Sequence, residues 1–116
     1  MQKLELFSNL VNLAASDRKF TEEEIKFLVD RAEQWGIHND EFETAMAGIT
    51  TGALTINIPE DHGQRVLLLK EMLRLMAVDG HLAEMEKKLC AKASGKMDFT
   101  TQQFNEILDD VIGEAN

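Results

Sequence analysis

Apolar residues recur every three or four positions in six separate segments of this 116-residue chain. This spacing places them on one side of an α-helix and therefore predicts an all-α helical bundle of about six helices. The fourth stripe is the most apolar, and we expect it at the centre of the core. In chain order the stripes are Leu4, Phe7, Leu10, Val11 and Ala14; Ile25, Leu28, Val29 and Ala32; Phe42, Ala45, Met46 and Ile49; Val66, Leu69, Met72, Leu73 and Met76; Met85, Leu89 and Ala93; and Phe104, Ile107, Leu108 and Val111.

Helix boundaries are marked by residues that satisfy free backbone groups. Thr21 precedes Glu24 by three positions, and Thr100 precedes Gln103 in the same way. Both pairs are typical of a capping box at the start of a helix. Gly36 follows the second stripe and can adopt the left-handed conformation that often ends a helix.

The stretch 50-TTGALTINIPED-61 breaks the helical pattern. Leu54, Ile56 and Ile58 alternate with polar residues, as they would in a β-strand. No second stretch offers a pairing partner, so we expect an extended crossover over residues 50–63.

The two halves of the chain are similar to each other at an offset of 62 residues. The pairs in register include Leu13 and Leu75, Ala15 and Ala77, Asp17 and Asp79, Glu22 and Glu84, Glu24 and Glu86, Lys26 and Lys88, and Phe42 and Phe104. We therefore expect one domain over 1–116, made of two pseudo-symmetric three-helix repeats at about 4–49 and 64–112.

Charge and composition exclude several functions. The formal net charge is −9, and residues 1–63 carry twelve acidic but only five basic residues. Such a charge repels phosphate groups, so we expect no binding to nucleic acid. The longest strongly apolar run, Val66 to Leu69, is far too short to span a bilayer, so we expect no direct insertion into a membrane. The single cysteine, Cys90, has no intrachain partner and favours a reducing, cytoplasmic location. We find no nucleophile motif or phosphate-binding loop, so we do not expect an enzyme.

The repeated acidic residues allow two interpretations. In 76-MAVDGHLAEMEKKL-89 and its twin 14-AASDRKFTEEEIKF-27, an Asp is followed seven positions later by a Glu. Asp17, Glu24, Asp79 and Glu86 could together hold a divalent cation, because four adjacent carboxylates repel unless a cation lies among them. Alternatively, each could cap or stabilise the start of the next helix. The motif is not an EF-hand loop. In a loop that begins at Asp79, the third, fifth and seventh positions are His81, Ala83 and Met85, and the third and fifth lack the side-chain oxygen ligands that an EF-hand requires.

The same motif, apolar-Ala-x-Asp-[Gly]-x-apolar-x-x-x-Glu, resembles that of the tellurite-resistance TerB family. Arg65 before an apolar helix and the turn Trp35-Gly36-Ile37 add to the resemblance, which covers nearly the whole chain. That family includes the N-terminal region of a membrane-anchored DnaJ-like co-chaperone. The resemblance implies a cytoplasmic helical bundle with a role in metal or chemical stress, a membrane-associated stress complex as partner, and metal bound by the paired acids. Arg18 stands where the pattern has Gly.

Two functions follow from these observations. The first is a non-enzymatic, TerB-like stress-response module that binds a protein partner and a divalent cation. The second is a helical adaptor that only binds protein, recognising an amphipathic or basic segment, with the acids serving as helix caps.

The cation hypothesis predicts saturable binding of Ca²⁺, Mg²⁺, Mn²⁺ or Zn²⁺ to the metal-free protein, measured by titration calorimetry. Replacement of Asp79 by Asn should abolish that binding, because it removes a charged oxygen ligand. No binding to the unmodified protein, with Asp79→Asn costing only stability, would mean that the acids are caps.

Overall fold

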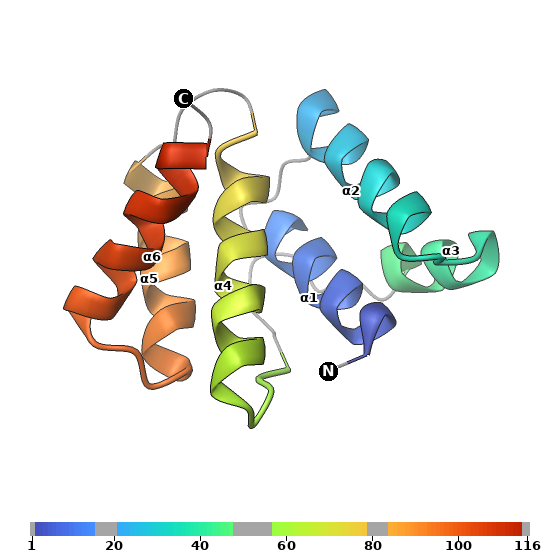
Figure 1. Cartoon of the computed structure of the whole chain (residues 1–116). Coiled ribbons are helices and arrows are strands. Elements are labelled where there is room, and N and C mark those ends of the chain that lie inside the picture. Colours follow the sequence, from blue (N-terminus) through green and yellow to red (C-terminus); the bar gives the residue numbers. More distant parts are fainter. Residues whose placement is uncertain (1, 16–20, 48–56, 79–83, 115–116) are drawn as a thin grey trace. The chain divides into compact units, whose positions relative to one another are not determined.

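A computed structural model describes residues 2–15, 21–47, 57–78 and 84–114. These residues form α-helices and no strand, which confirms the all-α prediction. The helices are α1 (Lys3–Ala15), α2 (Glu22–Gln34), α3 (Asn39–Ala47), α4 (His62–Met76), α5 (Glu84–Lys96) and α6 (Thr101–Glu114) (Figure 1). None of these described helices has the length and apolar character needed to cross a membrane.

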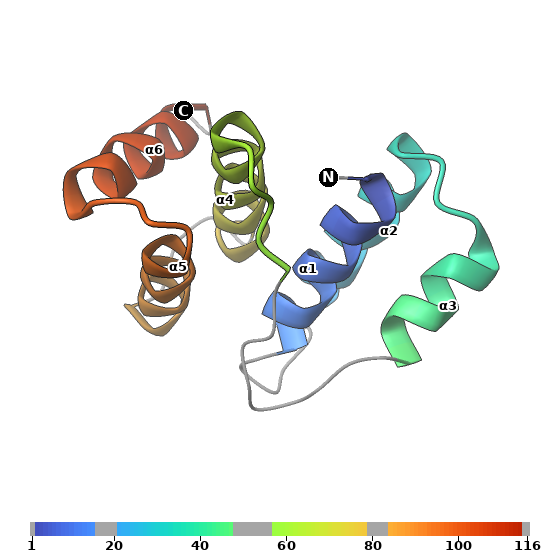
Figure 2. The same ribbon diagram turned by 90° about the horizontal axis from the view of Figure 1, so that it is seen from below.

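The chain divides into two compact units, Met1–Asn57 (unit 1) and Ile58–Asn116 (unit 2). Each unit contains three helices (Figures 1 and 2). The division falls within the predicted crossover, of which residues 50–56 lie outside the described residues. The single domain over 1–116 stays a prediction.

Unit 1 is organised around α1, which packs against both α2 and α3. The ring of Phe7 is fully buried, and its centroid lies 5.5 Å from that of Phe42 on α3. From α2, Leu28 and Ala32 are buried as well. The buried residues of α1 are Leu6, Phe7, Asn9, Leu10, Val11, Leu13, Ala14 and Ala15.

Both ends of α2 are fixed by backbone hydrogen bonds. At its start, the Thr21 hydroxyl accepts from the Glu24 N–H at 3.1 Å, and the Glu24 carboxylate accepts from the Thr21 N–H at 3.2 Å. This confirms the predicted capping box. At its end, Gly36 has a φ of 67°, and the Ile37 N–H donates to the Ala32 carbonyl at 2.9 Å. These are the features of a Schellman motif, and the tight turn leads directly into α3 (Figure 2).

A buried asparagine on α1 holds residue 57 of the predicted crossover. The Asn9 side chain donates to the Asn57 carbonyl at 2.8 Å and accepts from the Asn57 N–H at 2.7 Å. Asn9 is only 1% exposed, so these two bonds replace the water that its amide would otherwise bind. They hold residue 57 beside the middle of α1.

Unit 2 is organised around α4, which packs against α5 and α6, while α5 also contacts α6. Leu68, Leu69, Met72, Leu73, Leu75 and Met76 of α4 are almost completely buried. This confirms the fourth stripe as a core element. The predicted stripe of α6 is buried too, namely Phe104, Ile107, Leu108 and Val111.

Arg65 links the start of α4 to the end of α5. Its guanidinium donates to the Pro59 carbonyl at 2.6 Å and to the Met97 carbonyl at 2.9 Å, and lies 3.5 Å from the Asp98 carboxylate. Asp98 has a φ of 65°, a conformation that Asp tolerates better than most residues. Arg65 therefore satisfies a carbonyl of the turn that ends α5.

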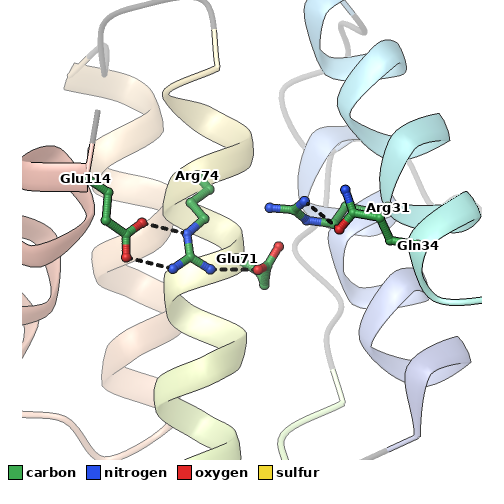
Figure 3. A network of polar contacts seen from close by, with 5 residues as sticks. All are labelled: Arg31, Gln34, Glu71, Arg74 and Glu114. Carbon is green, nitrogen blue, oxygen red and sulfur yellow. Dashed lines mark hydrogen bonds and ion pairs between the residues drawn. The ribbon is translucent and has the colours of Figure 1, made fainter. Parts of the chain in front are cut away.

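Arg74 forms a bidentate ion pair between α4 and α6. It makes two hydrogen bonds of 2.9 Å with the Glu114 carboxylate on α6, and a third of 2.7 Å with Glu71 on its own helix (Figure 3). The hydrogen bond with Arg74 lowers the pKa of the exposed Glu114. The bidentate geometry holds the end of α6 against α4.

Replacing Asn9 with Ala should lower the free energy of unfolding by about 1–3 kcal/mol, because two buried hydrogen bonds are lost together. Urea unfolding followed by circular dichroism measures this change. Asn12→Ala on the same helix is the matched control, since it makes the same gain in helix propensity. An equal effect of both substitutions would contradict the structural role of Asn9.

Candidate functional site

The structure describes two of the four acidic residues predicted to bind a cation. Asp17 and Asp79 lie outside the described residues. Glu24 is 4% exposed, belongs to unit 1 and accepts the Thr21 N–H in the capping box. Glu86 is half-buried on α5 of unit 2. Within the described part of the chain, no group of three or more His, Cys, Asp or Glu side chains could hold a metal ion. The four-residue cation site stays a prediction.

Cys90 faces the core of unit 2 beside Glu86. It is fully buried, as expected for a small apolar residue. Burial, and to a lesser degree the negative charge of Glu86, raises the pKa of the Cys90 thiol to about 12. Since the thiolate is the reactive form, the folded protein keeps this cysteine unreactive near neutral pH.

A shallow groove runs between α1 and α3 in unit 1. Its volume is about 290 Å³. It has a small apolar floor from Leu4 and Ala45, while Asp40 and Glu41 contribute carboxylates. We call it the α1–α3 groove; it is lined by Leu4, Ser8, Asn12, Asp40, Glu41, Thr44 and Ala45.

A second groove lies between α2 and α3. Its volume is about 160 Å³. We call it the α2–α3 groove; it is lined by Val29, Ala32, Glu33, Ile37, Asn39 and Phe42. Its neighbour Ile25 is 42% exposed and Val29 is 39% exposed. The apolar stripe of α2 is thus only half covered, because α3 packs mainly on α1.

Both grooves lie in a strongly acidic region. Residues 22–47, which include α2 and α3, contain eight acidic and two basic residues, a formal charge of −6. This segment therefore carries two-thirds of the net charge of the whole chain, and Glu33, Asp40 and Glu41 line the grooves themselves. The arrangement combines exposed apolar side chains with carboxylates, which favours contact with a basic and apolar ligand.

Sequence reasoning missed both grooves. It placed Ile25 and Val29 on the same apolar stripe as Leu28. The periodicity of a stripe does not indicate which of its residues are buried and which are exposed. The acidity of residues 1–63 was the one sequence feature that pointed to this region.

Comparisons of the chain with protein-family models, with curated proteins and with solved structures found no match.

The burial of Cys90 predicts slow modification of its thiol in the folded protein. An aromatic disulfide reagent such as dithionitrobenzoate should modify Cys90 at least about a hundredfold more slowly in the native protein than in 6 M guanidinium at pH 8, because burial excludes reagent and disfavours the thiolate. The absorbance of the released thiolate measures the rate. Equal rates in both conditions would show that Cys90 is accessible.

Proposed function

We propose that this chain is a non-enzymatic helical module that binds a protein partner through the surface of unit 1. The observation that carries the proposal is the pair of grooves on either side of α3, where apolar side chains lie exposed beside carboxylates. Apolar side chains exposed beside carboxylates can contact an apolar and basic segment of another protein.

The size of the grooves also favours a protein ligand. Pockets that enclose small molecules have volumes of roughly 300–1,000 Å³. The α2–α3 groove, at about 160 Å³, is smaller than this range and can accept side chains rather than a whole metabolite, while the α1–α3 groove, at about 290 Å³, lies at its lower limit.

We also propose that units 1 and 2 arose by duplication of one three-helix unit. In support, α2 and α5 begin 62 residues apart and end 62 residues apart. The left-handed residues that follow them, Gly36 and Asp98, have the same separation. Seven buried positions of α1 have a buried counterpart 62 residues later in α4: Leu6, Phe7, Asn9, Leu10, Val11, Leu13 and Ala14.

The TerB-like role is a further proposal, and it rests on the sequence. It includes a cytoplasmic location, a membrane-associated stress complex as the partner, and a divalent cation bound by the repeated acids. The capping box occupied by Glu24 favours the adaptor alternative for that residue, since its carboxylate already stabilises the start of α2.

Site-specific photo-crosslinking in the source cells tests the partner-binding function. We expect a benzophenone side chain at the exposed Thr44, or at Glu33, to form a discrete adduct with another protein. Each position lines one of the two grooves. Denaturing electrophoresis followed by mass spectrometry detects and identifies the adduct.

Asn105 is the control, because it is exposed on α6 and lines neither groove. We expect no adduct there. Failure of both groove positions, or an equally strong adduct at Asn105, would refute a binding surface on unit 1.

A further inference from the structure

We propose that the α2–α3 groove binds an amphipathic helix of the partner, one that carries basic residues beside its apolar face. This inference rests on the proposed function and adds the chemistry of the partner to it. Three features of unit 1 support it: an exposed apolar stripe on α2, a third helix (α3) that has no buried residue, and a concentration of negative charge.

The exposed stripe has the spacing that a docking helix requires. Ile25 and Val29 are four residues apart on α2 and therefore lie one above the other on its surface. Val29 lines the groove together with Ile37 and Phe42, which are half-buried. A partner helix can place apolar side chains along such a row at its own three- and four-residue spacing.

The third helix of unit 2 is buried more completely than the third helix of unit 1. Phe99 and Phe104 stand 62 residues after Ile37 and Phe42, and they are only 9% and 5% exposed. Four residues of α6 are buried, whereas α3 has no buried residue. The third helix of unit 1 therefore leaves more of its apolar surface uncovered than the third helix of unit 2 does.

The negative charge near the groove favours a partner helix that carries basic residues. Eight acidic residues lie in the segment 22–47, and Glu33 lines the groove itself. These carboxylates attract Lys and Arg and repel phosphate groups, so they favour a basic protein segment over nucleic acid or an anionic membrane. A symmetric dimer through this groove is disfavoured, because the same acidic helices of two copies would face each other.

The test uses the full chain and a fluorescein-labelled, 18-residue Leu/Lys peptide designed as an amphipathic helix. Fluorescence anisotropy should show saturable binding that weakens as salt is added, because part of the attraction is between charges. Two further peptides are the ligand controls. One has Glu in place of Lys, and the other has the same composition arranged without an apolar face. We expect neither to bind.

Val29→Lys should weaken binding by at least about tenfold, since it places a repelling charge in an apolar contact. Ile25→Lys should act in the same direction and provides a second variant. Ile112→Lys is the matched control, because Ile112 is 46% exposed on α6 and the substitution changes the net charge equally. We expect it to leave affinity within about twofold. Circular dichroism confirms that each variant is folded.

Several results would overturn the inference. Equal loss in Val29→Lys and Ile112→Lys would mean that only net charge matters. Equal binding of the rearranged peptide would show that the apolar face is irrelevant. A dimer in sedimentation that Val29→Lys converts to monomer would assign the groove to a second copy. Absence of peptide binding together with a partner adduct at Thr44 would refute this inference but leave the proposed function standing.

Discussion

Each unit depends on the burial of one central helix. Isolated helices of nine to fifteen residues, the range found here, are marginal in water, so their stability must come from packing. In unit 1 only α1 contacts both other helices extensively, and in unit 2 α4 contacts both. Loss of the apolar contacts of α1 or α4 would therefore remove the surface on which its two neighbours fold.

Polar contacts then set the direction in which the chain leaves these helices. The Schellman turn at Gly36 fixes how α3 follows α2, and the turn at Asp98 does the same for α6. Arg65 donates to the carbonyls of Pro59, before α4, and Met97, after α5. Asn9 binds the backbone of residue 57. Since buried polar groups are costly when unpaired, these bonds also restrict the alternatives available to the chain.

The candidate site arises from incomplete coverage of an apolar stripe. The pattern correctly predicted that Leu28 and Ala32 are buried, but it assigned Ile25 and Val29 to the same stripe. Their exposure depends on where α3 packs, and that is decided by contacts such as the one between Phe7 and Phe42. Sequence periodicity describes one helix at a time and contains no information about this neighbour. The paired acids were visible in the sequence, and for Glu24 the structure shows the cap.

The sequence by itself determined the class of fold, the starts of α2 and α6 and the end of α2. These features depend on local physics, namely the 3.6-residue period, the capping hydroxyls of Thr21 and Thr100, and the conformational freedom of Gly36. Only the tertiary structure decided which apolar residues stay exposed, that Arg65 and Asn9 bind distant backbone groups, and that grooves flank α3. Those outcomes depend on contacts between segments far apart in the chain, whose geometry no local pattern specifies.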